Sequence, residues 1–292
     1  MSSALTFVLV FGLMMGAVYL LIALGFSLVC GVLRIFHLGY AYFFPLTIYG
    51  TWLFISEFGL PLAQSIVAMV VVQLVLSVVL YKFMIRRTME TDELTLLTGL
   101  LLTALIIEQL VAWRYPIQTG VYLNTTIMDG IWKFGRAVVP KQLVIASIVA
   151  VVMTSLFALF FIKTKMGLAV RALSQDILNS QIVGLNVEKL YSRTMMLILL
   201  PVVVAMLLIA PVWTVEPAMG WQYMTTAILI SVLGGLGNIK GTIIASFLIG
   251  FTHSTMCFLV QEPRFMNLSA LVLVMVILIV RPQGIARSES LW

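Results

Sequence analysis

Few side chains in the apolar parts of this chain are able to do chemistry. Glu108 and His253 stand within long apolar stretches, and an ionisable residue in such a stretch is a candidate functional group. His37 and His253 are far apart in the sequence, and Cys30 and Cys257 fall in separate apolar runs. An enzyme site or a metal site needs a cluster of such residues. The sequence therefore predicts neither an enzyme nor a metal site.

The composition indicates that lipid, rather than water, surrounds most of the chain. Of the 292 residues, 62% are apolar and only 10% are charged, whereas a soluble domain carries about 25% charged residues. The apolar residues form long runs, and about 20 of them in a helix cross a bilayer. The first run is too long for the core of a cleavable signal peptide, so we expect a membrane helix there.

Nine apolar segments can be recognised, and all should be helical because an open strand cannot satisfy its backbone in lipid. They are Leu5–Val29, Gly39–Ile55, Pro61–Tyr81, Leu94–Ala112, Leu143–Ile162, Thr194–Trp213, Tyr223–Leu236, Thr242–Val260 and Phe265–Val280. Tyr223–Leu236 and Phe265–Val280 are too short to span upright, so each is either a half-helix or is extended by its flanks. We predict an all-α, polytopic bundle of about eight to ten membrane segments, in one domain covering residues 1–292.

The distribution of Lys and Arg predicts the orientation, because these residues are enriched on the cytoplasmic side. If the loop Lys163–Arg193 is cytoplasmic, alternation places 12 of the 17 Lys and Arg residues on that side. They are Arg34, Lys82, Arg86, Arg87, Lys163, Lys165, Arg171, Lys189, Arg193, Lys240, Arg281 and Arg287. The N-terminus is then outside and the C-terminus inside. Because the basic residues border the membrane, the net charge of +6 does not indicate nucleic-acid binding.

The loop Lys163–Arg193 contains a helix-compatible stretch, Met166–Val183, which the stop signals Gly184 and Asn186 follow. Small and apolar residues at three- and four-residue steps give this helix one face: Ala169, Ala172, Leu173, Ile177 and Ser180. Two interpretations stay open, a helix that a cytoplasmic motor pushes or a solvated loop at the membrane surface. The outer connection Trp113–Lys141 is either a plain connector or a docking surface for an external partner.

Two further motifs mark breaks in the apolar pattern. Four glycines stand within eight residues: Gly234, Gly235, Gly237 and Gly241. A lipid-facing helix cannot contain such a run, so we expect a structural break that is buried in protein or lines a cavity. The residue order of a phosphate-binding loop is absent. Arg281–Gly284 is expected to end the last helix, because the proline and glycine stop it and the arginine suits its C-terminus.

Together these motifs resemble the permease subunits of the branched-chain amino acid ABC importers, a group that also serves urea, short amides and some aromatic acids. The resemblance covers nearly the whole chain and implies a fold like that of type II ABC importers. It is carried, in this order, by Gly12–Gly25, Gly31–Arg34, Gly167, Arg171, Asp176, Gly184–Asn186, Gly234–Gly237, Gly241 and Arg281–Gly284.

The resemblance implies a multi-pass subunit of the bacterial inner membrane with several partners. These are a second, homologous permease, two ATP-binding cassette subunits, and a periplasmic substrate-binding protein. ATP hydrolysis would reside in the partners, so this chain would be no enzyme and would hold no cofactor. Residues 163–193 would be its coupling loop, and the coupling residues would be Gly167, Arg171, Asp176, Leu178, Asn179, Ser180, Gln181 and Gly184. We expect residues 176–184 to form the helix that engages the ATPase, with Ile177, Ser180 and the stem of Gln181 in its groove.

The chain departs from the family pattern just after Arg34. There the family commonly has a stretch like Leu-Ile-Asn-Phe-Ala-His-Gly-Asp, and this chain has Ile35–Tyr42. The Asn, His and Asp positions are occupied by His37, Tyr40 and Tyr42, so an acidic group is lost and two aromatic rings are gained. If this segment touches the solute pathway, the ligand differs from an ordinary branched-chain amino acid.

A second class of function, a stand-alone ion-coupled secondary transporter, predicts buried ionisable pairs. Its candidates are Glu108 and His253, and neither has an evident acidic partner. Glu108 lies near the outer end of its segment, so it either reaches water or belongs to the solute pathway with His37, Tyr40 and Tyr42. For His253, in the middle of Thr242–Val260, we favour a structural hydrogen bond.

Overall fold

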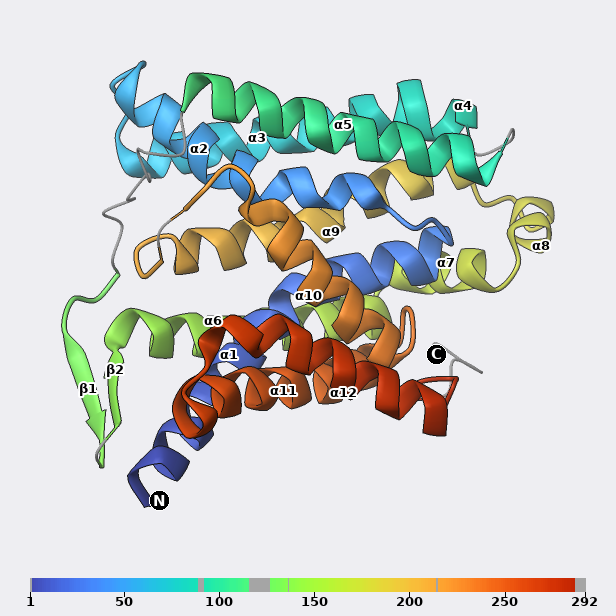
Figure 1. The fold of residues 1–292 in the computed structure, drawn as a ribbon. Helices are drawn as coiled ribbons and strands as arrows, with labels where there is room; N and C mark the ends of the chain where they lie inside the picture. The colour runs from blue at the N-terminus through green and yellow to red at the C-terminus, as the bar shows by residue number, and fades with distance from the viewer. Residues whose placement is uncertain (1, 89–91, 116–126, 136, 214, 287–292) are drawn as a thin grey trace.

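The computed structural model describes residues 2–88, 92–115, 127–135, 137–213 and 215–286. Within them, eight helical stretches are long and apolar enough to cross a membrane, which confirms the predicted polytopic bundle. Each of these stretches contains one long helix, and these helices run side by side along the bundle (Figure 1). They are α1 (Ser2–Leu28), α2 (Phe43–Ser56), α3 (Leu62–Leu80), α5 (Glu93–Arg114), α6 (Lys141–Lys163), α9 (Val187–Ile209), α11 (Ile239–Thr255) and α12 (Met266–Val280).

The two segments that looked too short differ in the structure. The 3-10 turn η5 (Pro263–Phe265) extends α12 into an 18-residue stretch that meets the length of a span. The other segment becomes α10 (Met219–Gly234), which has 16 residues and stays shorter than the eight spans. Shorter turns complete these helices: η1 (Val29–Leu33), η2 (Leu38–Tyr42), η3 (Tyr81–Ile85), α4 (Arg86–Thr88) and η4 (Met256–Val260).

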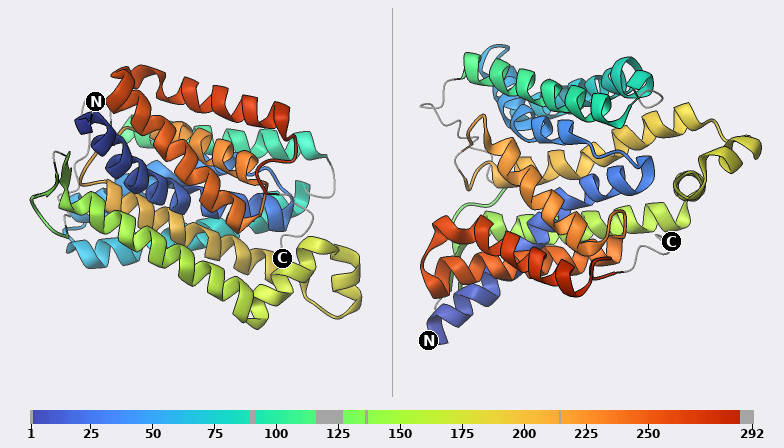
Figure 2. Two further views of the ribbon diagram at one scale, coloured as in Figure 1. Left: turned by 90° about the horizontal axis from the view of Figure 1, so that it is seen from below. Right: turned by 45° about the vertical axis from the view of Figure 1, so that its right-hand side comes forward.

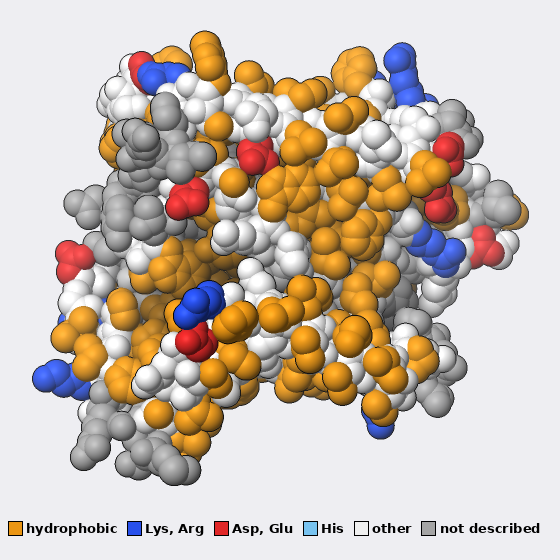
Figure 3. Space-filling view, in the orientation of Figure 1, with side chains coloured by type: hydrophobic (Ala, Val, Ile, Leu, Met, Phe, Trp, Pro, Cys, Tyr) orange, Lys and Arg blue, Asp and Glu red, His pale blue; other side chains and the backbone are white. Residues whose placement is uncertain are grey.

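Helix α1 forms the centre of the bundle, where it packs against α6, α9, α10 and α11. Its crossing with α11 depends on small residues. A Cβ added to Gly250 would lie 2.7 Å from the Cα of Gly16, so two glycines let these helices approach closely. Large apolar side chains remain exposed on the outer helices, among them Val71, Leu102 and Val276. Hydrophobic side chains also cover much of the face in Figure 3, as expected for a surface in contact with lipid.

The bundle has two distinct ends, which we call the hairpin end and the α7–α8 end (Figure 1). At the hairpin end, β1 (Ile131–Phe134) and β2 (Ala137–Pro140) pair antiparallel, with Ile131 opposite Pro140. At the other end, α7 (Lys165–Gln175) and α8 (Ile177–Ile182) project beyond the spanning helices (Figure 2). No pattern in the sequence indicates this hairpin. Residues 116–126 of the same connection lie outside the described residues.

The stretch 166–183 is two helices, so the prediction of a single helix is wrong. Asp176 adopts an extended conformation, with φ −153° and ψ 114°, and breaks the helix there. Its carboxylate Oδ1 accepts a hydrogen bond from the backbone N–H of Asn179 at 3.0 Å. An aspartate that caps the next helix competes with helix continuation through its own position, which explains the break.

Candidate coupling site and solute pathway

Helix α7 is held tightly against the end of α6. The hydroxyl of Thr164 caps it by accepting from the N–H of Gly167 at 3.0 Å. A Cβ on Gly167 would lie 2.6 Å from the Cα of Phe161 and 2.7 Å from the carbonyl oxygen of Phe160, so no larger residue fits without a backbone shift. Arg171 adds a hydrogen bond from Nη2 to the carbonyl of Ile162 at 3.3 Å. These contacts connect α7 directly to the end of α6.

Arg34 links the opposite end of α7 to the central helix. It follows η1 at the end of α1, and its Nη2 donates to the carbonyl of Ser174 at 2.8 Å and to that of Gln175 at 3.2 Å. A helix leaves its last carbonyls unpaired and carries a partial negative charge there, so a guanidinium is a favourable cap. The charge pattern places Arg34 among the basic residues of one side, but no local pattern in the sequence indicates this contact.

Helix α8 is short, and hydrogen bonds define both of its ends. Asp176 begins it, and Asn179 Nδ2 also donates to Asp176 Oδ2 at 2.7 Å. At its end the N–H of Leu185 donates to the carbonyl of Ser180 at 3.0 Å, and the N–H of Gly184 donates to that of Gln181 at 2.9 Å. Gly184 has φ +89°. This is the Schellman arrangement, in which glycine takes the left-handed position.

The predicted contact face of α8 is exposed only in part, and its docking to an ATPase stays a prediction. Ser180 is only 5% exposed and Ile177 packs against a buried cluster of this chain's own residues, whereas Gln181 is exposed. Next to Gln181, Ile182 and Val183 are each 81% exposed. The side chain of Leu178 lies outside the described residues. The exposed apolar pair at the end of α8 is Ile182 and Val183.

The four-glycine stretch lies in the turn between α10 and α11. Gly235 and Gly237 have φ +92° and +79°. A Cβ on Gly234 would lie 2.6 Å from the carbonyl carbon of Gly241, so the two helices meet backbone to backbone. The hydroxyl of Ser27 in α1 accepts from the N–H of Gly237 at 3.0 Å, which fixes the turn to the central helix.

The chain segment after α12 folds back onto this glycine turn. The N–H of Ile285 donates to the carbonyl of Leu233 at 2.8 Å, and Gly284 has φ +79°. A Cβ on Gly235 would lie 2.7 Å from the carbonyl oxygen of Ala286. Two motifs that sequence analysis treated separately, the glycine break and Arg281–Gly284, thus form one packed unit.

Three predicted pathway residues lie inside the core. His37, Tyr40 and Tyr42 are 3%, 0% and 1% exposed. The Tyr40 hydroxyl donates to the carbonyl of Ile22 at 3.1 Å, so this side chain has a structural role in packing η2 against α1. Burial lowers the pKa of His37, which precedes the second span, to about 4. Contact of these three with a solute stays a prediction.

Glu108 is in α5, which packs against η2, the turn that contains Tyr40 and Tyr42. The indole Nε1 of Trp221 in α10 donates to its carboxylate, which connects α5 to α10. The Glu108 side chain is half-buried. The carboxylate therefore has a neutral donor as its partner, and a place on the solute pathway stays a prediction for this residue too.

Two neighbouring cavities, which sequence analysis did not find, lie at Tyr19 and His253. One of about 250 Å³ and one of about 210 Å³ share Tyr19, Trp213, His253 and Met266 as lining residues. The Tyr19 hydroxyl lies 2.9 Å from Nδ1 of His253. This confirms a hydrogen bond for His253, and it also places the imidazole beside open space. No local sequence pattern indicates such a pair, because its members come from α1 and α11.

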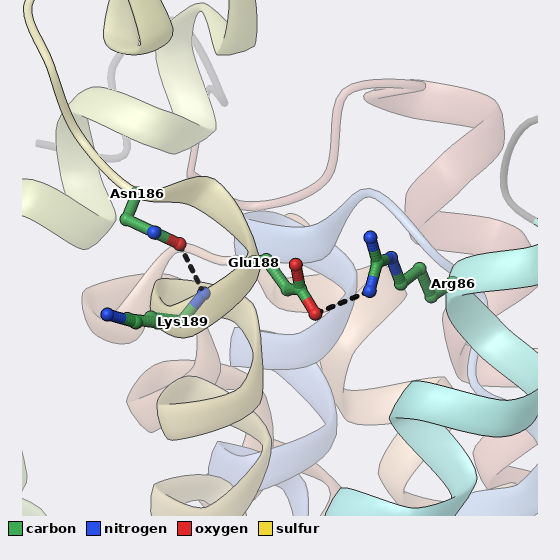
Figure 4. A network of polar contacts seen from close by, with 4 residues as sticks. All are labelled: Arg86, Asn186, Glu188 and Lys189. Atoms are coloured by element: carbon green, nitrogen blue, oxygen red, sulfur yellow. Dashed lines mark hydrogen bonds and ion pairs between the residues drawn. The ribbon is translucent and has the colours of Figure 1, made fainter.

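A polar network at the α7–α8 end fixes the start of α9 (Figure 4). The Asn186 side chain accepts from the N–H of Lys189 at 3.0 Å and so caps α9. Arg86 of α4 donates to Glu188 Oε1 at 2.6 Å. About half of each charged side chain is exposed, so this pair contributes less than about 1 kcal/mol.

Comparison with known proteins bears on the whole chain. It is 24% identical over 295 residues to the high-affinity branched-chain amino acid transport system permease protein BraD of Pseudomonas aeruginosa, a similarity that covers 95% of this chain and 94% of BraD. It is 21% identical over 290 residues to the corresponding permease protein LivH of Escherichia coli strain K12, with 94% and 92% covered.

Among solved structures, a chain of the PsaBC complex from Streptococcus pneumoniae with a Fab shares the fold. The TM-score is 0.53 at 15% identity, with 94% of this chain and 92% of that chain covered. A family model described as the permease component of the branched-chain amino acid transport system matches residues 8–281. Since this match spans almost the entire chain, the protein belongs to the family of branched-chain amino acid transport system permease components, as its motifs indicated.

Proposed function

We propose that this chain forms, together with a second permease of the same family, the solute pathway of an ABC importer in the bacterial inner membrane. Two ATPase subunits would drive it from the α7–α8 end, and a periplasmic binding protein would deliver solute at the hairpin end. The solute would be a branched-chain amino acid or a related small solute, as the names of BraD and LivH suggest. In this proposal the chain itself hydrolyses no ATP and holds no cofactor.

The observation that carries the proposal is the exposed pair Ile182 and Val183 on α8. Two adjacent apolar side chains at 81% exposure lie on a helix that projects from the bundle, where a protein partner gains by covering them. The connections of α7 to α6 and α1 give a displacement of this pair a direct route into the membrane helices.

The alternative, a stand-alone ion-coupled transporter, has less support. Its two candidate groups have neutral partners, because Glu108 accepts from Trp221 and His253 bonds Tyr19. Proton or sodium coupling calls for ionisable residues in the membrane that pair with one another or line an ion path. Membership of the permease family also favours the importer subunit.

The test is assembly of the complex from its neighbouring genes, followed by ATP-driven uptake into proteoliposomes. The double variant Ile182→Asp/Val183→Asp should reach the membrane at the wild-type level but fail to retain the ATPase subunits on purification. Leu94→Asp is the matched control, because Leu94 is 69% exposed in the first turn of α5 at the same end. Retention of the ATPase by the double variant would refute docking at α8.

A further inference from the structure

We propose that the two cavities beside Tyr19 and His253 form a binding site for a net-neutral, amphipathic solute. Its polar head would bond Nε2 of His253, and its apolar tail would occupy the larger cavity. The inference rests on the proposed function, because such a site would hold the solute during its passage through the membrane.

The buried imidazole is the first observation. His253 is only 4% exposed, and its Nδ1 already contacts the Tyr19 hydroxyl. Its Nε2 is buried and has no hydrogen-bond partner among the described residues. A buried polar atom without a partner is unfavourable, so a bound molecule that forms a hydrogen bond with it gains free energy. Because the tyrosine hydroxyl can donate to Nδ1 or accept from it, Nε2 is able to accept or to donate.

The two cavities differ in the residues that only one of them contacts. The smaller, of about 210 Å³, is lined by side chains that donate and accept hydrogen bonds: Gln222, Tyr223, Thr226 and Asn267. The larger, of about 250 Å³, is lined mainly by apolar side chains and sulfur: Phe11, Met15, Ser254, Cys257 and Phe258. His253 and Tyr19 lie at the boundary, since they line both. This division matches a solute with one polar and one apolar part.

The charge of the lining residues selects the class of head group. None of the residues that line either cavity is Asp, Glu, Lys or Arg. A solute with net charge would meet no opposite charge there, and the cost of burying it would be uncompensated. A zwitterion or an amide has no net charge. Gln222 and Asn267 each offer an NH₂ donor and a carbonyl acceptor for such a head. Figure 3 shows the face hollowed near the start of α10, with hydrophobic side chains around the hollow and one basic and one acidic side chain at its lower edge.

Two substitutions at one position separate solute binding from structural support. His253→Asn keeps a polar group near Nδ1 for Tyr19 but removes the group at Nε2. His253→Gln places a polar group near Nε2 but removes the contact with Tyr19. The probe is radiolabelled L-leucine, which has a net-neutral head and an aliphatic tail, and it is added without ATP to nanodiscs that hold the assembled permease and ATPase subunits without the binding protein. We expect the Gln variant to bind like wild type and the Asn variant to bind about tenfold more weakly, the effect of one lost hydrogen bond. An excess of L-glutamate or L-lysine should not displace the probe.

Several outcomes overturn the inference. They are equal binding by the wild type and the Asn variant, loss of binding only in the Gln variant, displacement by L-glutamate or L-lysine, or no binding of L-leucine by the wild type. The size-exclusion profile of both variants checks that they fold. Failure of the proposed function is distinguishable, because the wild-type complex would then show no ATP-driven uptake, whatever residue occupies position 253.

Discussion

Two glycine turns at the α7–α8 end use the same residue type for different purposes. Gly184 has φ +89°, and no atom lies within 4 Å of a Cβ added to it. Gly241 has an ordinary helical position, but a Cβ on it would clash with the carbonyl of Gly234. Position 184 therefore requires glycine because of its backbone conformation. Position 241 requires glycine because there is no room for a Cβ atom. The first turn ends a projecting helix, whereas the second joins two packed helices to each other.

The surroundings of the two turns differ in the same way. Beside Gly184, Ile182 and Val183 are exposed and have no packing partner in this chain's core clusters. Around the other turn, Ser27 of α1 and Ala286 after α12 pack against the glycines. The proposed partner contact lies at the α8 turn, whereas the α10–α11 turn holds helices of the bundle together. Four predictions, each with its own variants, can break or sharpen this assignment.

The largest effect is expected from Gly241→Ala. The added methyl group meets backbone rather than a movable side chain, so α10 and α11 must separate, at a cost of about 3 kcal/mol or more. Yield and monodispersity of the purified protein measure the loss. Gly99→Ala in α5 is the matched control, since its Cβ would meet only the mobile methyl end of Met84, at 2.6 Å. Normal yield of Gly241→Ala would show that the turn is not packed as described.

The next effect is expected from Gly184→Val, which should leave membrane insertion intact and abolish stimulation of ATP hydrolysis by the binding protein and solute. A β-branched residue strains this left-handed position by about 1–3 kcal/mol, which disturbs the end of α8 without touching a spanning helix. The readout is ATPase activity of the complete complex in nanodiscs.

Gly135→Val controls for backbone strain as such. Gly135 has φ +62° with no atom within 4 Å of an added Cβ, and it lies in the hairpin at the other end of the bundle. The Gly135→Val variant should keep the ATPase subunits bound, whereas Gly184→Val should weaken their attachment. If both variants retain the ATPase equally, the α8 turn has no special role in attaching the ATPase, and the functional difference between the two glycine turns is contradicted.

A smaller effect is expected from Arg34→Gln. Loss of the guanidinium removes the contacts to Ser174 and Gln175, and the end of α7 should loosen by about 1 kcal/mol, as for a charged hydrogen bond that is partly in water. Hydrogen exchange of the α7 amides should accelerate about fivefold, while exchange in α11 stays unchanged. Equal acceleration in both helices would mean that Arg34 supports the whole bundle.

The smallest effect is expected from the ion pair of Arg86 and Glu188. A double-mutant cycle with Arg86→Gln and Glu188→Gln should give a coupling free energy below about 1 kcal/mol, which declines with added salt, because both side chains are about half exposed. The free energy of unfolding in detergent is the measurement. A coupling of several kcal/mol would make this network a structural element comparable to the glycine turn.

Sequence alone predicts the membrane architecture well for a physical reason. Lipid imposes long apolar helices, so spans such as α1 and α6 can be located from apolar runs. The glycine break was also placed, since Gly235 and Gly237 stand where a helix cannot continue. Local chemistry was harder, because Asp176 was assigned to a helix interior although an aspartate equally favours the cap position.

The candidate sites were predicted less well, because they depend on which helices meet. Ser180 has the spacing of a contact face, but in the structure its side chain is only 5% exposed. Tyr40 was identified from a departure from the family pattern, and the structure places it in the core. The pair of Tyr19 and His253 joins α1 to α11, and only the tertiary packing brings them together.

Site-specific photo-crosslinking in the assembled complex tests the central claim most directly. A photoreactive residue at position 183 on α8 should crosslink to an ATPase subunit in inverted membrane vesicles. The same residue at the exposed position 133 of the hairpin should give no ATPase adduct. A crosslink to the ATPase from position 133, or none from position 183 while the complex still hydrolyses ATP in response to solute, would contradict the account.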